Sequence, residues 1–268
     1  MRKILCGLAA ISLAFNLGTA QAEKLVLTGS STVASLALEI GKRFERLHPG
    51  VRVDVQTGGS SRGISDARAG LADIGMASRA LKPEEADLYA HSIALDGVAL
   101  IVHKSNTISA LSDDRVRAIY TGKVTQWSEV GGAARKIVVV NKAEGHSTLE
   151  LFLHYFKLSN PDIRAQVVIG DNQQGIKTVA ANPDAIGYVS IGTAEYEAAH
   201  GTPVRLLPLR GVAASVANVR NGQFPLSRPL NLVTKTPPVG LVKTFIEFAQ
   251  SATVHDLIDA QYFIPLAR

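Results

Sequence analysis

Residues 25–33 of the chain are LVLTGSSTV, a run that passes from apolar residues to small polar ones. The first three residues predict a short buried strand, and the glycine, serines and threonine predict a loop that opens a helix. Apolar residues follow at spacings of three and four, the period of one helix face; they are Val33, Leu36, Ile40, Phe44 and Leu47. We expect His48-Pro49-Gly50 to end this helix.

The same order of strand, small-residue loop and helix occurs twice more. In the second instance Val51, Val53 and Val55 alternate as a strand, residues 58–63 (GGSSRG) form the loop, and the helix has Ile64, Ala67 and Leu71 on one side. In the third, residues 137–140 form the strand, residues 144–148 (EGHST) the loop, and the apolar helix positions are Leu149, Phe152, Leu153 and Phe156. Alternating strands and helices predict an α/β fold with mainly parallel sheets.

The three loops are candidate anion-binding sites. Each follows the carboxyl end of a predicted strand, where ligands bind in open α/β sheets. Each also opens a helix, whose first amides lack internal partners and whose dipole places partial positive charge there. The alternative for any single loop is that it only caps its helix, because Ser, Thr and Gly are common N-cap residues. No P-loop spacing or dinucleotide fingerprint is present.

Composition limits the classes of protein that fit this sequence. The chain has 268 residues, 46% of them hydrophobic and 19% charged, which suits one large domain or two lobes. The formal net charge is +5, and both signs are interspersed without a basic run, so nucleic-acid binding is unsupported. Cys6 is the single cysteine and the histidines are scattered, so we expect no metal site and no cofactor.

The amino end has the pattern of a signal peptide. Arg2 and Lys3 precede an apolar stretch over residues 4–17, and Thr19-Ala20-Gln21-Ala22 has the small residues that signal peptidase requires. The apolar stretch is shorter than the roughly 20 residues that a spanning helix needs. We therefore expect cleavage after Ala22 and secretion to the periplasm, with removal of two positive charges and of Cys6.

Seven segments, in consistent order along the chain, resemble those of the phosphate-binding proteins of bacterial phosphate ABC transporters, which have the type II periplasmic binding-protein fold. The segments are residues 28–33 (TGSSTV), 58–64 (GGSSRGI), 72–79 (ADIGMASR), 97–102 (GVALIV), 119–122 (IYTG) with Trp127, 186–189 (IGYV) and 224–230 (FPLSRPL). The resemblance implies two lobes joined by a hinge of crossing strands near residues 97–103 and 224–234, with the ligand trapped between the lobes. It implies lobe 1 over residues 23–102 plus 225–268 and lobe 2 over residues 103–224.

The resemblance also implies which residues bind the ligand. Lobe 1 would contribute Ser31, Thr32 and the amide of Val33, then Ser60 and Ser61, and then Ser78 with Arg79. Lobe 2 would contribute Lys142, Gly145, His146, Ser147 and Thr148. These groups would donate hydrogen bonds to the oxygens of an oxyanion, where bonds to charge are strong.

The second-lobe loop departs from the family pattern. Lys142 stands where the family has arginine, and an ammonium group lacks the planar fork of a guanidinium. His146 and Ser147 replace Ser and Gly, and contact of His146 with an anion would make affinity depend on pH between about 5 and 8. Ser78 stands where some members have an aspartate that accepts a hydrogen bond from the proton on phosphate. Glu144 is either a contact residue or a solvent-facing loop residue.

The expected function is capture of inorganic phosphate by a monomer and its delivery to an inner-membrane ABC permease. Two alternatives stay open: a binding protein for another oxyanion (sulfate, molybdate, tungstate) or a small organic anion, and a sensor or adhesion role of the same fold. An enzyme is not expected. The segment 145–149 (GHSTL) resembles the Gly-x-Ser-x-Gly turn of hydrolases only in part, because Leu149 replaces the last glycine.

Overall fold

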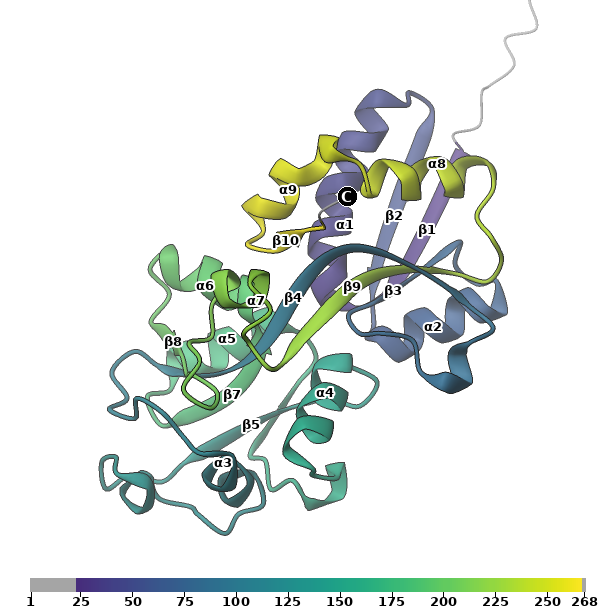
Figure 1. Cartoon of the computed structure of the whole chain (residues 1–268). Coiled ribbons are helices and arrows are strands. Elements are labelled where there is room, and N and C mark those ends of the chain that lie inside the picture. The colour runs from purple at the N-terminus through teal and green to yellow at the C-terminus, as the bar shows by residue number, and fades with distance from the viewer. Residues whose placement is uncertain (1–22, 267–268) are drawn as a thin grey trace, which may run out of the picture.

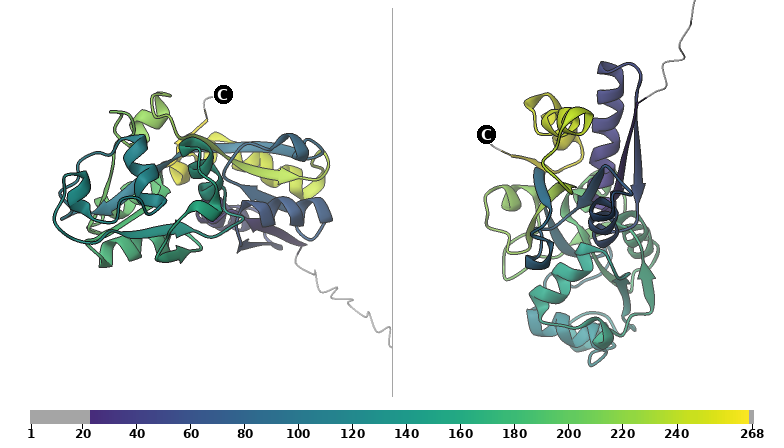
Figure 2. Two further views of the ribbon diagram at one scale, coloured as in Figure 1. Left: turned by 90° about the horizontal axis from the view of Figure 1, so that it is seen from below. Right: turned by 90° about the vertical axis from the view of Figure 1, so that its right-hand side faces the viewer.

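A computed structural model describes residues 23–266, which form two lobes connected by two long strands (Figure 1). Figure 2 shows the molecule from two further directions; the two lobes follow each other along its long axis. The predicted signal peptide, residues 1–22, lies outside the described residues.

The first lobe contains the first two instances of the strand-loop-helix pattern. Strand β1 pairs in parallel with β2 on one side and β3 on the other. The carboxyl-terminal part of the chain returns to this lobe and packs against α1 (Figure 1). Its elements are β1 (Glu23–Gly29), α1 (Ser31–Leu47), β2 (Val51–Thr57), α2 (Ser60–Ala69), β3 (Ile74–Ala77), η1 (Pro83–Glu85), α8 (Gly240–Ala249), η4 (Ala252–Val254), α9 (His255–Ala260) and β10 (Ile264–Pro265).

The second lobe is built around β7, which pairs in parallel with β5, and β5 pairs in parallel with β6. Its helices cover this sheet (Figure 1). Its elements are α3 (Asp113–Tyr120), η2 (Trp127–Val130), β5 (Val138–Lys142), α4 (Ser147–Phe156), η3 (Asn160–Asp162), β6 (Val167–Ile169), α5 (Asn172–Ala181), β7 (Ala185–Ser190), α6 (Ile191–Ala199), β8 (Val204–Leu206) and α7 (Val216–Arg220).

Strands β4 (Tyr89–His103) and β9 (Ser227–Thr234) connect the lobes. They pair with each other antiparallel, from Tyr89↔Thr234 to Gly97↔Ser227. The continuous strand order is β2-β1-β3-β9-β4-β7-β5-β6, so one curled sheet runs through both lobes. The predicted α/β fold with two lobes and crossing strands is confirmed. The strands within each lobe are parallel as predicted, whereas the connecting strands are antiparallel to their neighbours.

The predicted lobe boundaries lie close to these connecting strands and remain a prediction. Residues 98–102 of β4 pair with β7 in the second-lobe sheet, although the predicted division places them in lobe 1. The chain therefore enters the second-lobe sheet near Gly97, several residues before the expected boundary.

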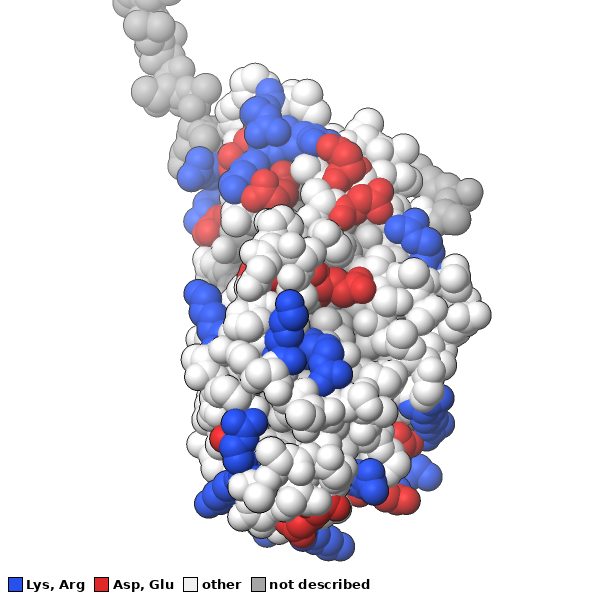
Figure 3. Space-filling model, turned by 90° about the vertical axis from the view of Figure 1, so that its left-hand side faces the viewer, with Lys and Arg blue, Asp and Glu red and all other residues white. Residues whose placement is uncertain are grey.

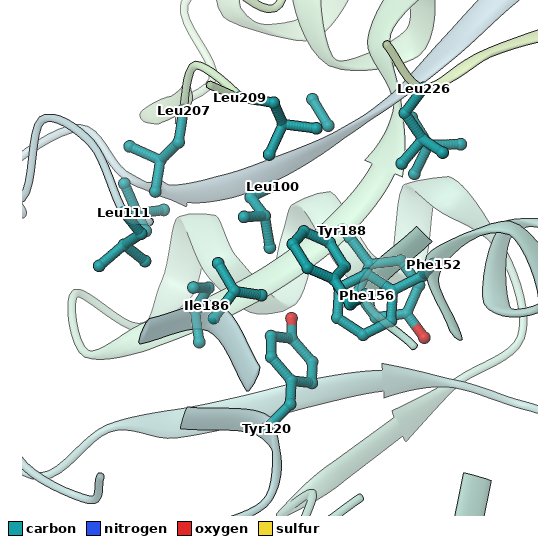
Figure 4. Close-up of a cluster of buried hydrophobic side chains, with 14 of the residues drawn as sticks. Leu100, Leu111, Tyr120, Phe152, Phe156, Ile186, Tyr188, Leu207, Leu209 and Leu226 are labelled. Carbon is teal, nitrogen blue, oxygen red and sulfur yellow. The ribbon is translucent and has the colours of Figure 1, made fainter. Parts of the chain in front are cut away.

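Each lobe has its own apolar core. In the first lobe, α1, α8 and α9 bury residues such as Phe44 and Phe245 against the strands. In the second lobe the core is rich in aromatic rings (Figure 4), and the rings of Phe152 and Tyr188 stack with centroids 3.9 Å apart. Separate cores allow the lobes to move relative to each other as units.

Two apolar residues of the predicted helix faces are exposed. Leu71 lies beyond the end of α2, because Gly70 takes a left-handed conformation that stops the helix, and Leu71 is 73% exposed. Leu47, in the last turn of α1, is 61% exposed. Both residues fit the helical period, but no part of the fold covers them.

The surface carries charges of both signs. On the face in Figure 3, Lys and Arg side chains alternate with Asp and Glu in small groups rather than forming one continuous patch. Within residues 23–266, no helix has the length and apolar character needed to cross a membrane.

Candidate functional site

The three small-residue loops meet between the lobes, beside the end of β3. They line a small cavity, which we call the cleft site. Its lining residues come from both lobes; they are Ser30, Ser31, Thr32, Gly59, Ser60, Ser78, His146, Ser147 and Thr148. Seven of them are predicted ligand-binding residues, and Ser30 and Gly59 were not predicted.

Three helices begin at the cleft site. Helix α1 begins at Ser31, α2 at Ser60 and α4 at Ser147. Because the first amides of a helix have no internal acceptor, three positive helix ends surround one small cavity. Gly59 is required here: its φ is +89°, and a Cβ atom would lie 2.6 Å from the carbonyl oxygen of Gly145 in the other lobe.

A chain of hydroxyl groups crosses the cavity. Ser30 donates to Ser78 at 2.9 Å, Ser78 and Ser147 lie 2.6 Å apart, and Ser147 and Ser60 lie 2.9 Å apart. Ser60 also accepts from the backbone N–H of Ser78 at 3.2 Å. The cleft site is thus lined by neutral hydroxyls that can turn their protons toward an anion.

Arg228, which was not among the residues expected from sequence, lies directly behind these hydroxyls. Its side chain is fully buried and pairs with buried Asp96 at 2.8 Å. Its Nη1 donates to Ser78 at 3.2 Å and to Thr148 at 2.9 Å, and its Nη2 donates to Thr32 at 3.2 Å.

These bonds determine what the hydroxyls can do. A hydroxyl oxygen that accepts a hydrogen bond from the guanidinium can still donate its own proton to another acceptor. Thr32 accepts a second bond, from Asn172 at 3.0 Å, and Ser78 accepts a second bond from Ser30. Both lone pairs of each oxygen are then occupied, so Thr32 and Ser78 face the cavity as donors. A cavity of donors backed by a buried cation suits an oxyanion.

Lys142 is buried behind the cleft site and does not line its cavity. Its ammonium group donates to Asn172 Oδ1 at 3.2 Å, and Asn172 in turn bonds Thr32. Burial, together with the nearby Arg228 cation, lowers the pKa of Lys142 to about 7. Lys142 thus reaches the cavity through an intermediate side chain rather than directly.

Four further predicted residues lie beside the cavity in contacts of their own. Arg79 pairs with Glu85 at 2.7 Å and with Glu150 of α4 at 2.8 Å. The Ser61 hydroxyl donates to Glu150 at 3.1 Å, and the Ser61 amide donates to the carbonyl of Gly145 at 3.0 Å. The amide of Val33 donates to Ser30 at 3.4 Å. Arg79, Ser61 and Gly145 therefore connect the lobes.

His146 lines the cavity as the N-cap of α4, and its Nδ1 lies 3.2 Å from the carbonyl oxygen of Glu144. The Glu144 carboxylate instead accepts from the Asn160 side chain at 2.8 Å and does not line the cavity. The arrangement thus favours His146 over Glu144 as the residue that meets a ligand.

The sequence contained a partial signal for the residues that were missed. Arg228 lies within the segment 224–230 that carries the family resemblance, and Asp96 directly precedes the segment 97–102. Neither segment contains the loop of Gly, Ser and Thr between a strand and a helix that indicates the other binding residues. Asn172, at the start of α5, had no comparable signal.

Comparison with known proteins gives a consistent result. Residues 16–253 match the family model of the PBP superfamily domain. The phosphate-binding protein PstS of Bacillus subtilis is 28% identical over 97% of this chain and 88% of its own length.

Two solved structures are similar over their whole length. A Clostridium perfringens protein assigned as the substrate-binding protein of a phosphate ABC transporter, with bound phosphate, is 32% identical with a TM-score of 0.84, covering 91% of this chain and 100% of its own. An ABC-type phosphate transport receptor from Vibrio cholerae is 29% identical with a TM-score of 0.75, covering 90% of this chain and 100% of its own.

Proposed function

This chain belongs to the PBP superfamily and, within it, to the substrate-binding proteins of phosphate ABC transporters, and on that premise we propose that it captures inorganic phosphate in the cleft site. The observation that carries the proposal is the contact of buried Arg228 with Thr32, Ser78 and Thr148. These hydroxyls come from three segments in two lobes, so one anion can hold both lobes together.

The binding residues follow from this arrangement. We assign direct contact to Ser31, Thr32, Ser60, Ser78, His146, Ser147 and Thr148, which line the cavity, together with the first amides of α1, α2 and α4. Arg228 orients Thr32, Ser78 and Thr148 from behind the cavity. Arg79, Ser61 and Gly145 act by joining the lobes.

The wider role follows the relatives. The phosphate-loaded protein delivers its ligand to an inner-membrane ABC permease and works as a monomer in the periplasm. Export uses a signal peptide that is cleaved after Ala22. These statements rest on the family and on the sequence pattern of residues 1–22.

One observation favours a second candidate ligand, sulfate. No carboxylate is among the described residues that line the cavity, so no carboxylate accepts a hydrogen bond from protonated phosphate or repels a fully ionised oxyanion. The imidazole of His146 lines the cavity and can accept a hydrogen bond from protonated phosphate through a ring nitrogen.

Calorimetry on residues 23–268 tests the proposal, with phosphate, sulfate, molybdate and tungstate as ligands. We expect phosphate to bind most tightly. Absence of heat with phosphate at millimolar concentration would overturn the proposed function, and tighter binding of sulfate would reassign the ligand.

A Thr148→Val variant tests the site assignment. It keeps the shape of the side chain but removes a hydroxyl that donates to the anion, and a hydrogen bond to a charged group contributes about 1.5–3 kcal/mol. We expect a loss of roughly 10- to 100-fold in phosphate affinity by calorimetry. The control is Thr244→Val on α8, whose hydroxyl bonds only the local carbonyl of Gly240; equal affinities of the two variants would refute the assignment.

A further inference from the structure

Lys142 is a buried lysine without an ion-pair partner. Lys142 is 2% exposed. Among residues 23–266, no carboxylate lies within ion-pairing distance of its side-chain nitrogen. The polar contact that the group does make is with a neutral oxygen, Oδ1 of Asn172, at 3.2 Å. A buried charge is costly unless it is paired, so this position favours the neutral amine until negative charge arrives nearby.

The charged and titratable groups around Lys142 do not supply that negative charge. Arg228 on β9 is a second cation, and Asp96 is already paired with it. Tyr188 on β7 accepts from the Lys142 backbone amide, and burial raises its pKa above the ordinary value, so it stays neutral. Asp171, the N-cap of α5, attracts the ammonium group, but its carboxylate accepts from the amide of Gln174 and forms no ion pair with Lys142.

Two hydrogen bonds connect Lys142 with the cleft site. Asn172 accepts from the ammonium group through Oδ1 and donates through Nδ2 to Thr32 at 3.0 Å. Thr32 lines the cavity. The hydrogen bonds run from Lys142 through Asn172 to Thr32, so a protonated lysine and an oxyanion in the cavity favour the same orientation of these groups. The region is buried, so water screens the attraction between the two charges only weakly.

We propose that Lys142 is a positioning residue that takes up a proton when the oxyanion binds, and that it acts on the cleft site through Asn172. This inference rests on the proposed function. By linkage, an anion that favours the protonated lysine is itself bound more tightly when the lysine is protonated.

The direction of the pH dependence follows. In the free protein burial lowers the pKa of Lys142 to about 7, and the bound anion raises it. Below that pKa the lysine is already charged, and binding needs no proton. Above it, each binding event must first protonate the amine, so affinity falls by up to about tenfold per pH unit until the pKa of the bound state is reached.

Proton uptake can be measured by calorimetry with phosphate in pairs of buffers that differ in ionisation enthalpy. For the protein with Lys142 we expect little uptake by this residue near about pH 6 and an uptake approaching about one proton near about pH 8.5. Lys142→Met is the control, since it keeps a similar chain length and retains His146 and the proton exchange of phosphate itself. Its uptake should be lower by the lysine's contribution, and its affinity should approach that of the unmodified protein at high pH.

The outcomes separate the two proposals. Phosphate binding with equal proton uptake by the unmodified protein and by Lys142→Met near about pH 8.5 would overturn the role of Lys142 and leave the proposed function standing. Absence of phosphate binding at both pH values would overturn the proposed function and the role of Lys142 together. Lys142→Arg, which stays charged throughout, gives a second check that does not depend on the methionine variant folding: its affinity should lack the loss above pH 7.

Discussion

At the residue scale, Arg228 joins three hydroxyl groups that are far apart in the chain. Thr32 and Thr148 lie 196 and 80 positions away from it, and Asp96, which balances its charge, lies 132 positions away. The guanidinium suits this position because its donors point in fixed directions within one plane. Its role is indirect: it orients the donors that meet the ligand.

The Arg228–Asp96 pair supports a prediction on stability. Arg228→Met leaves the Asp96 carboxylate buried without a cation, which costs about 3–5 kcal/mol in free energy of unfolding. Adding Asp96→Asn removes that charge, so the double variant should recover much of the stability, as measured by urea denaturation. It should not recover phosphate affinity, because the hydroxyls stay without their donor. Equal stability of the single and double variants would contradict this account.

At the scale of elements, the positions of helix starts decide where the hydroxyls lie. Helix α2 packs closely on β1 and β3 through Gly63, and a Cβ atom there would lie 2.6 Å from the Thr28 carbonyl oxygen and 2.7 Å from that of Met76. Both obstacles are backbone atoms, which cannot move aside as a side chain can. The close approach sets Ser60, at the start of α2, against Ser147 of the other lobe.

Gly63→Ala should therefore lower both stability and affinity. Overpacking of this kind costs about 1–3 kcal/mol, and displacement of α2 moves Ser60 out of reach of the ligand. The matched control is Gly58→Ala, whose Cβ would have the flexible side chain of exposed Arg62 as its nearest neighbour. Urea denaturation and phosphate calorimetry on both variants provide the check, and a Gly63→Ala protein as stable as the control would count against the packing argument.

At the scale of the whole molecule, ionic and polar contacts join the two lobes beside the cavity. Glu150 of α4 reaches Arg79 at 2.8 Å, Lys82 at 3.1 Å and the hydroxyl of Ser61 at 3.1 Å, all in the first lobe. A contact made only when the lobes close favours the closed state by its own free energy. Ligand retention thus depends on residues that do not touch the ligand.

Glu150→Gln should weaken phosphate binding through this closure. Arg79 keeps Glu85 as its partner, so no buried cation is left unpaired and the stability of the lobe should change little. A loss of about 1 kcal/mol from the closed state corresponds to roughly fivefold weaker binding. Small-angle scattering of the ligand-free variant should also show a more extended molecule. The control is Glu247→Gln, whose exposed pair with Lys243 on α8 lies far from the cleft; if both variants bind alike, closure does not depend on Glu150.

The sequence alone was enough to predict the α/β class, the three strand-loop-helix units and most residues that line the cavity. Hydrophobic period, helix-capping residues and glycine turns act between near neighbours in the chain, so a short window contains them. Leu71 shows the limit of this reasoning, because the hydrophobic period continues to Leu71 although Gly70 already ends the helix.

Tertiary structure decided which distant groups surround each charge. It brought Arg228 and Asp96 together behind hydroxyls from both lobes, buried Lys142 next to Asn172, and turned Arg79 toward Glu85 and Glu150. The energy of a charge depends on its burial and on its neighbours in space, and neither can be read from nearby residues in the chain. For that reason the loops of the site, with Arg79 and Lys142, could be selected from sequence, whereas Arg228 and the partner of each cation could not.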